Sequence, residues 1–301
     1  MNALTGSGRS VLIIGGSSGI GLATALRLAA QGDRLTLMAR SREALDGAAT
    51  ACREVGAPEV AVACGDVAHA ADVEAAVSTA RAEHGRLDVV ILTATVMSYG
   101  RVEDTPPEIF AAVTDVAIHG TVHVAQAVLP LMRQQGGGIL IIVNSLLGSV
   151  TVPQMGAYAT AKWGQRALVR TLQQEVRNAK NVHVCLVSPG SINTPIYYQA
   201  ANYTGRGTRP PVPVQQPERT AAVIVGLTRR PRAHTSVPVG PPNPLIISGF
   251  RFAPWIYDRL VGPLFALGGL TSKTTPPTEG NVLGPIADRE RARGHWPPPT
   301  P

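Results

Sequence analysis

A tyrosine and a lysine stand four residues apart in the segment Tyr158-Ala-Thr-Ala-Lys162. At this spacing the two side chains lie one turn apart on the same face of a helix. A phenol ordinarily titrates near pH ~10, and a nearby ammonium group lowers its pKa because the positive charge favours the phenolate. The pair is therefore predicted to act as a general acid and base, with Ser145 placed to polarise the same substrate oxygen.

The lysine of this pair is one of only three in a chain whose positive charge is otherwise carried by arginine. Arginine stays protonated and presents a planar, branched group, so it would replace a compact ammonium poorly at such a site. The lysine at position 162 therefore favours a chemical role for the pair over a chance spacing.

A glycine-rich turn lies near the start of the chain, between an apolar run at 11–14 and a segment with helical periodicity. Glycines at this place let the turn tighten and let backbone amides approach a pyrophosphate at the start of a helix. We therefore predict that a dinucleotide cofactor binds here, at Gly15, Ser17, Ser18, Gly19, Ile20 and Gly21.

The residues that follow the next two predicted strands bear on which cofactor binds. Arg40 ends the second strand, with no acidic residue beside it. An acidic residue there would bind a ribose 2′-hydroxyl, whereas an arginine suits a 2′-phosphate, so NADP(H) is favoured over NAD(H). Asp66 follows the third strand, where its carboxylate is equally suited to the adenine amino group and to a helix cap.

The remaining chain alternates between short apolar runs and helical patterns, which predicts an α/β protein with a doubly wound parallel sheet, the Rossmann fold. Residues 1–240 are predicted to form this single domain, and residues 241–301 a Pro- and Gly-rich extension. The predicted strands are 11–14, 35–38, 60–62, 87–92, 139–143, 182–187 and 237–239, and the main helices 22–29, 41–55, 72–84, 107–135, 158–179 and 218–227.

Composition bounds the remaining possibilities. The 301 residues are 45% hydrophobic with a net charge of +7, but the arginines are scattered and have no interleaved aromatic residues, so we expect no nucleic-acid partner. The three cysteines are far apart, without the spacing of a metal site or disulfide framework. No signal peptide or membrane-spanning run is recognisable, so a cytoplasmic protein is expected.

Taken together, residues 9–240 resemble the short-chain dehydrogenase/reductase family, with some similarity to its 3-ketosphinganine reductase-like members. The serine precedes the tyrosine by thirteen residues, as in the family. The motifs that carry the resemblance are Gly15-x-x-x-Gly19-x-Gly21, Asp66-Val67, Ser145, Tyr158-x-x-x-Lys162, and Pro189-Gly190 followed by Thr194.

The resemblance implies an enzyme that interconverts a carbonyl and a secondary alcohol with a nicotinamide cofactor. It implies that Lys162 also holds the nicotinamide ribose beside Tyr158, and that Ile192 and Thr194 meet the carboxamide and a phosphate. It further implies a homodimer or homotetramer formed through the helices at 107–135 and 158–179. By the same resemblance, the cofactor site includes Val67, Ala94, Pro189 and Gly190.

Two segments depart from the family pattern. The segment Leu92-Thr-Ala-Thr95 retains only Ala94 of the family's Asn-Asn-Ala-Gly, and the family's fourth catalytic residue, an asparagine, is Ala117 here. Thr93, Thr114 or His119 is a candidate to supply the missing polar group. The same departures leave open a nucleotide-binding regulator or scaffold with weak or no catalysis.

His119 and His123 have a spacing that can bind a metal ion, but no third ligand is evident nearby, and no metal site is expected. They are more simply explained as histidines on a helix surface or at a subunit interface.

The C-terminal extension is predicted to contain an apolar patch at 245–270, cut into short helices by Pro254 and Pro263, and an extended or disordered tail at 276–301. The segment at 204–217 is predicted to be a flexible lid or loop. The patch is expected first to cover the substrate cleft, second to form an oligomer interface, and last to lie on a membrane. The last alternative would make the protein a membrane-associated reductase of lipid ketones.

Overall fold

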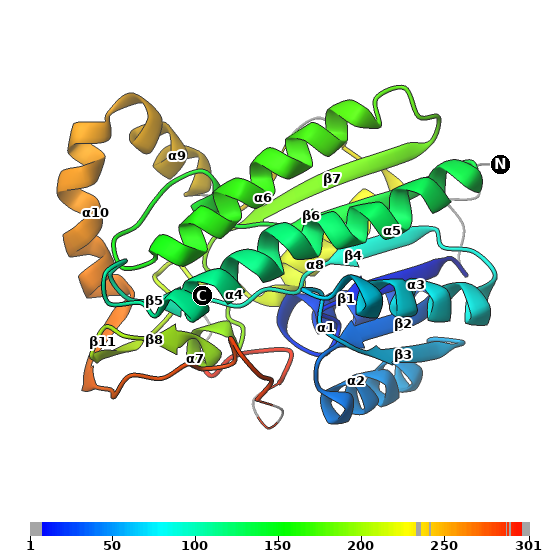
Figure 1. Ribbon diagram of the computed structural model, residues 1–301, viewed down its shortest axis with the longest axis horizontal. Coiled ribbons are helices and arrows are strands. Elements are labelled where there is room, and N and C mark those ends of the chain that lie inside the picture. The colour runs from blue at the N-terminus through cyan, green and yellow to red at the C-terminus, as the bar shows by residue number, and fades with distance from the viewer. Residues whose placement is uncertain (1–7, 233–235, 241, 287, 289, 297–301) are drawn as a thin grey trace.

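A seven-stranded parallel sheet forms the centre of the computed structural model, which describes residues 8–232, 236–240, 242–286, 288 and 290–296 (Figure 1). Every pairing within this sheet is parallel. The strand order β10-β7-β6-β4-β1-β2-β3 confirms the predicted doubly wound fold. The strands are β1 (Ser10–Ile14), β2 (Arg34–Ala39), β3 (Val60–Cys64), β4 (Val89–Leu92), β6 (Gly138–Val143), β7 (Val182–Pro189) and β10 (Ser236–Val239).

Helices cover both faces of the sheet, which explains why its strands are apolar throughout. Successive residues of β1 enter different clusters: Val11 packs with one and Leu12 with the other. One face is covered by α1 (Gly19–Ala29), α2 (Arg42–Glu54) and α8 (Pro217–Arg229). The other face is covered by α3 (Ala70–His84), α4 (Pro107–Thr114), α5 (Gly120–Gln134) and α6 (Gly156–Glu175).

The helix predicted over 107–135 is interrupted by a π-helical turn at Asp115–His119, between α4 and α5. A π turn places one extra residue in the helix and often marks a functional site. Ala117, the residue that replaces the family's asparagine, lies in this turn, and its carbonyl accepts a hydrogen bond from Thr121 Oγ1 at 2.6 Å. The hydrophobic periodicity did not reveal the interruption because Val113, Val116 and Val124 are all buried on one side.

The C-terminal extension forms two helices that stand beside the main body, α9 (Asn243–Phe252) and α10 (Pro254–Gly268) (Figure 1). Pro254 is the first residue of α10, where its missing N–H removes no intrahelical bond. The prediction that Pro263 also ends a helix is wrong, because α10 continues through it. Among the described residues, no helix is long and apolar enough to cross a membrane.

Small strands link the extension to the body. The loop predicted over 204–217 contains β9 (Arg206–Thr208), which pairs with β11 (Leu270–Thr274) of the extension. A second small sheet pairs β5 (Ser98–Tyr99) with β8 (Ala201–Asn202), and β8 directly follows the short helix α7 (Ile196–Gln199). After β11 the chain runs in an extended course past α7 towards α1, along the lower edge of Figure 1. The predicted tail at 276–301 thus follows an extended path where the structure describes it, and residues 287, 289 and 297–301 lie outside the described residues.

Candidate active site

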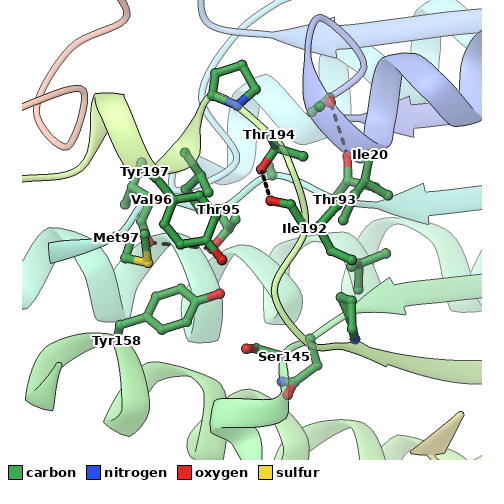
Figure 2. A pocket seen from close by; sticks show the side chains of 18 of the residues that line it. Ile20, Thr93, Thr95, Val96, Met97, Ser145, Tyr158, Ile192, Thr194 and Tyr197 are labelled. Atoms are coloured by element: carbon green, nitrogen blue, oxygen red, sulfur yellow. Dashed lines mark hydrogen bonds between the residues drawn. The ribbon is translucent and has the colours of Figure 1, made fainter. Parts of the chain in front are cut away.

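A cavity of about 320 Å³ opens at the carboxyl ends of β1, β4, β6 and β7. Ser145 follows β6 directly, and Tyr158 lies in the first turn of α6, so that both side chains face this cavity (Figure 2). The Ser145 hydroxyl accepts a hydrogen bond from Leu147 N at 3.1 Å, which fixes it at the start of a short 3₁₀ turn.

Tyr158 is buried, and burial raises the pKa of its phenol above the ordinary value. Hydrogen bonding with Ser145 acts in the opposite direction, as does a weaker contribution from Thr95. The Lys162 ammonium lies 5.7 Å from the centre of the Tyr158 ring. We expected this cation to lower the pKa of the phenol. In the protein without cofactor the pKa of the phenol is raised instead, because burial is the largest influence on it.

Lys162 is fully buried beneath the cavity and does not line it. Its Nζ donates hydrogen bonds to Val143 O at 3.3 Å and to Gln165 Oε1 at 3.1 Å. Burial lowers the pKa of the ammonium to about 7, since a charged group is costly to place away from water.

Gln165 is the polar partner of Lys162 that the sequence reasoning missed. Its Nε2 donates to Ala117 O at 3.2 Å and to Thr121 Oγ1 at 3.0 Å, and its Oε1 also accepts from Asn144 Nδ2 at 2.9 Å. The spacing of Gln165 from Lys162 is i, i+3 on a helix, a signal that could have been used.

The three candidates proposed in place of the family's asparagine all bond elsewhere. Thr93 Oγ1 donates to the carbonyls of Ile14 and Gly15 at 3.0 Å, and Thr114 Oγ1 donates within its own helix. His119 Nδ1 contacts Asp115 Oδ1 at 2.7 Å on the exposed face of the π turn. The prediction that one of them supplies the polar group beside Lys162 is therefore wrong.

The second histidine of the pair lies apart from the first. His123 Nδ1 contacts the carbonyl of Val67 at 3.1 Å. No cluster of three potential metal ligands is found in the part of the chain that the structure describes.

The glycine turn is shaped for close approach of a ligand or backbone. Gly15 has a φ of +89°, and a Cβ there would lie 2.5 Å from Ala94 N. A Cβ on Gly21 would lie 1.9 Å from Gly15 O, so α1 packs against the turn only because this residue is glycine. Such a cradle at a helix N-terminus fits the pyrophosphate of a dinucleotide.

Nearly all predicted cofactor residues line the one cavity, Lys162 being the exception because it lies underneath. The lining members are Gly15, Ser17, Ser18, Gly19, Ile20, Gly21, Arg40, Asp66, Val67, Ala94, Tyr158, Pro189, Gly190, Ile192 and Thr194. Residues from β1, β2, β3, β4 and β7 are thus brought to one edge of the sheet, as expected of a doubly wound fold.

Arg40 and Asp66 face each other at the far end of this cavity, with Arg40 Nη1 and Asp66 Oδ2 3.7 Å apart. The Asp66 carboxylate also accepts a hydrogen bond from Ala68 N at 2.9 Å, which closes the turn before α3. The Arg40 guanidinium donates to the carbonyls of Asn281 at 2.6 Å and Val282 at 3.2 Å, both in the C-terminal tail.

The tail also reaches the glycine turn itself. The backbone N–H of Gly19 donates to Arg291 O at 2.8 Å, and the Ser17 hydroxyl donates a short hydrogen bond to the Glu290 carboxylate. Burial raises the pKa of Glu290, against opposing effects of Ser17 and Arg40. No feature of the sequence predicted this contact, because the partners are 273 residues apart.

The chamber beside Tyr158 is predominantly apolar. Its wall is formed by residues of β5, α6, α7 and the extension, including Tyr99, Met155, Tyr197, Ile246 and Phe265. Tyr99 and Phe265 stack with their ring centres 6.2 Å apart, so α10 contributes directly to this wall. The prediction that the apolar patch covers the cleft is met by its inward-facing residues, whereas Phe252, Trp255 and Leu267 point to solvent.

Comparison with known proteins places this arrangement in a family. The family model for short chain dehydrogenases matches residues 9–202, about two thirds of the chain. The chain belongs to the short-chain dehydrogenase family. The expected family resemblance is therefore confirmed.

Curated relatives of the chain include a dehydrogenase/reductase and a 3-dehydrosphinganine reductase. Bovine dehydrogenase/reductase SDR family member 4 is 32% identical over 61% of this chain and 65% of its own length. The Arabidopsis thaliana 3-dehydrosphinganine reductase TSC10B is 36% identical over 64% of this chain and 57% of its own length. The chain thus spans less than two thirds of the length of these two relatives.

Solved structures of similar fold cover more of the chain. A levodione reductase superposes with a TM-score of 0.69 at 28% identity, covering 78% of this chain and 96% of the other. An NAD⁺-bound xylitol dehydrogenase (TM-score 0.70, 25% identity) covers 77% of this chain and 98% of its own. A metagenomic short-chain oxidoreductase in complex with NADP (TM-score 0.66, 26% identity) covers 78% and 99%.

Proposed function

We propose that the protein is an NADP(H)-dependent oxidoreductase that interconverts a carbonyl and a secondary alcohol, with Tyr158 as general acid and base. The observation that carries the proposal is the convergence of Ser145 and Tyr158 on the same cavity as the glycine turn, with Lys162 buried directly below. Family membership supports the same reaction class, and fold alone would not.

The residues divide the chemistry between them. The nicotinamide cofactor, when bound, supplies or accepts the hydride. Tyr158 carries its proton at neutral pH, as any phenol does, and can donate it to a carbonyl oxygen during reduction. Burial raises the pKa of the phenol and so weakens it as an acid, while the hydrogen bond with Ser145 opposes that shift. The Ser145 hydroxyl donates a hydrogen bond to the same oxygen, where negative charge develops. Lys162 lies behind the phenol and offers a cation that stabilises the phenolate once the proton has left.

The residues at the adenosine end favour NADP(H) over NAD(H). Arg40 lies at the end of β2 with a guanidinium group that matches a 2′-phosphate in charge and geometry. Asp66 lies beside it, where its second oxygen is suited to the adenine amino group. Solved relatives include both an NADP and an NAD⁺ complex, so this preference rests on Arg40.

The substrate is proposed to be an uncharged, largely apolar carbonyl compound or its alcohol. Among the described residues that line the cavity, the only charged side chains are Arg40, Asp66 and Glu290, which all lie at the adenosine end. The two alternatives, a scaffold without chemistry and a membrane-associated reductase of lipid ketones, are not favoured by these findings. We further propose that the enzyme works as a homodimer or homotetramer.

A substrate screen with both cofactors tests the proposal. We expect consumption of NADPH, and less of NADH, with apolar ketones, and no consumption with charged keto acids. The matched variant Tyr158→Phe should bind NADPH normally yet lose about 10²–10⁴-fold in turnover, the usual contribution of a general acid. Undiminished turnover in this variant would refute the role of Tyr158, and NADPH binding without turnover across the panel would favour the scaffold.

A further inference from the structure

We propose that Gln165 is a positioning residue that holds the Lys162 ammonium in place and links it to the π turn. The inference rests on the proposed function, because it concerns the lysine of that reaction. Gln165 is fully buried at the contact of α6 with the π turn and with the end of β6.

Every hydrogen-bonding position of the Gln165 amide is filled. Its oxygen accepts from Lys162 Nζ and Asn144 Nδ2, and its nitrogen donates to Ala117 O and Thr121 Oγ1. A flipped amide would point its N–H groups at the ammonium and at the Asn144 amide, so this network admits one orientation. The amide oxygen therefore stays directed at Lys162 Nζ.

Lys162 depends on this oxygen more than on its other neighbours. The ammonium has three N–H groups, and the other acceptor the structure gives it is Val143 O at 3.3 Å. The titratable side chain that faces it is Tyr158, on the same helix, while β6 and the π turn present the Val143 carbonyl, Asn144 and the Ala117 carbonyl. No carboxylate among the described residues contacts the ammonium, so the amide dipole is its principal support.

The role of Ala117 follows from the same contacts. Its methyl group offers no hydrogen bond, but its carbonyl receives Gln165 Nε2. The π turn thus anchors the far side of the glutamine through its backbone, and through the hydroxyl of Thr121 on α5. Gln165, which connects the π turn to Lys162, lies on α6 together with that lysine.

The test compares Gln165→Leu and Gln165→Glu in the full-length protein. Leucine removes the acceptor and should lower the pKa of Lys162 further, while glutamate places a carboxylate there and should raise it. We expect the pH at which unfolding stability changes slope, measured without cofactor, to move down in the first variant and up in the second. With a carbonyl substrate, kcat should fall about 10–100-fold in Gln165→Leu while KM changes less than about threefold.

Gln173→Leu is the matched control, because Gln173 is also a buried glutamine on α6, and its Nε2 donates to Val184 O at 3.1 Å outside the site. It should lose stability comparably without shifting any pH profile. A wild-type pH profile in both Gln165 variants would overturn the proposal. If wild-type protein turns over no substrate, the proposed function fails, but the pH dependence of unfolding still decides the role of Gln165.

We infer, from a separate set of contacts, that the tail competes with NADP(H) for the adenosine end of the cavity through Asn281, Val282, Glu290 and Arg291. Two groups of this end suited to bind phosphate are already engaged by the tail. The Gly19 amide, at the start of α1, bonds Arg291 O, and the Arg40 guanidinium bonds Asn281 O and Val282 O.

The contacts at the glycine turn exclude a phosphate in the same place. A backbone N–H has one hydrogen, and the Gly19 N–H cannot serve Arg291 O and a pyrophosphate oxygen at full strength together. The Glu290 carboxylate beside Ser17 would repel a pyrophosphate, since like charges at this range disfavour each other. Cofactor binding therefore requires this part of the tail to move away.

The chain before and after these contacts is bonded to the main body of the protein. The contacting residues can therefore be displaced from the cavity while the rest of the tail stays bound. Upstream, Thr278 and Asn202 exchange two backbone hydrogen bonds. Downstream, Arg293 pairs with Glu218 at 2.7 Å, and Trp296 stacks on Tyr198 at 5.4 Å. After displacement, Asn281, Val282, Glu290 and Arg291 would therefore stay tethered close to the cavity by the chain on either side.

The binding test uses Glu290→Ala in the full-length protein, with Glu279→Ala, an exposed glutamate of the same tail, as control. Titration of NADPH followed by its fluorescence should give a Kd about 3–10-fold lower for Glu290→Ala and within twofold of wild type for Glu279→Ala. An unchanged or weaker affinity in Glu290→Ala would overturn the inference, the weaker affinity because it would make the tail part of the cofactor site.

Limited trypsin digestion gives a second readout that needs no turnover. Arg291 is exposed, but its carbonyl is held by the Gly19 N–H. Displacement of the tail by NADPH should free this backbone to enter the protease and speed cleavage after Arg291 by about threefold or more. Slower or equal cleavage with saturating NADPH would contradict the inference even if the affinities agreed with it.

Discussion

The two ends of the cavity are built in different ways. At the catalytic end, Lys162 and Gln165 are completely buried and contact residues of α6, β6 and the π turn. At the adenosine end, the Arg40 and Asp66 side chains keep about a fifth to a quarter of their surface exposed, and Arg40 bonds backbone carbonyls of the tail. One end is fixed by the core, whereas the other is held by contacts that a ligand can replace.

The difference shows that the rigid acid–base groups and the exchangeable cofactor contacts lie at opposite ends of the same cavity. The acid–base groups need a constant geometry, which close packing and filled hydrogen bonds provide. The cofactor must enter and leave, and groups held by partly exposed hydrogen bonds exchange more readily. Substitutions at the two ends should therefore affect different measurements.

After Tyr158→Phe, the largest effect is expected at the same catalytic end, from Ser145→Ala. Loss of a hydrogen bond to the developing oxyanion should lower kcat by about 10²–10³-fold. The Kd for NADPH should stay within about threefold, because Ser145 does not contact the glycine turn. Ser149→Ala, a buried serine outside the cavity lining, is the control. Equal losses in kcat and NADPH affinity would show that the two ends are not separate.

The second effect concerns stability, and Lys162→Met measures it. The folded-state pKa of about 7 lies below the unfolded value of 10.5, so between these values the unfolded chain binds more protons and wild-type stability rises with pH. We expect the unfolding free energy of wild type relative to the variant to increase by up to about 1.4 kcal/mol per pH unit in this window. Lys180→Met, an exposed site, should show no such slope.

A third, smaller effect is expected at the adenosine end from Arg40→Ala. Loss of the guanidinium should weaken NADPH binding relative to NADH by about tenfold, the worth of one charge-assisted hydrogen bond. NADH binding itself should strengthen slightly, because the tail loses its bonds at Asn281 and Val282. Arg42→Ala, whose side chain pairs with Asp46 on the surface, is the control. An unchanged ratio of the two Kd values would remove the basis for NADP(H) preference.

The smallest effect is expected from Arg293→Ala, which removes the ion pair with Glu218. The Arg293 side chain is 62% exposed and that of Glu218 is 38% exposed, and ion pairs in contact with solvent contribute less than about 1 kcal/mol. The Kd for NADPH should fall by less than about twofold, and added salt should abolish the difference from wild type. A larger change would mean that the tail's downstream anchor, not Glu290, controls entry of the cofactor.

Features that depend on residues close together in the chain could be predicted from the sequence. Ser145, Tyr158 and the glycine turn were found because each lies on or beside an apolar strand or a helix with clear periodicity. The switch of α4 to a π turn at Asp115 left no trace in that periodicity, since buried valines continue on the same side through it.

Gln165 and the tail were missed for a different reason. Gln165 matters through contacts with β6 and the π turn, up to 48 residues away, which no local pattern encodes. Glu290 reaches Ser17 only because the sheet edge and the extension meet in space. Pro263 was misread because the propensity of proline to end helices was given more weight than the apolar residues of α10 around it.

The path of the tail has a consequence for the timing of biosynthesis. Residues 281–291 leave the ribosome after the glycine turn and β10, and at ~5–20 residues per second the roughly fifty residues between β10 and Glu290 take about 3–10 s. During that interval Gly19 and Arg40 have been synthesised, but the tail residues that bond to them in the finished protein have not. A dinucleotide that arrives then meets no competing segment, so we expect the unfinished chain to bind NADP(H) more readily than the finished chain, in which the tail must first be displaced.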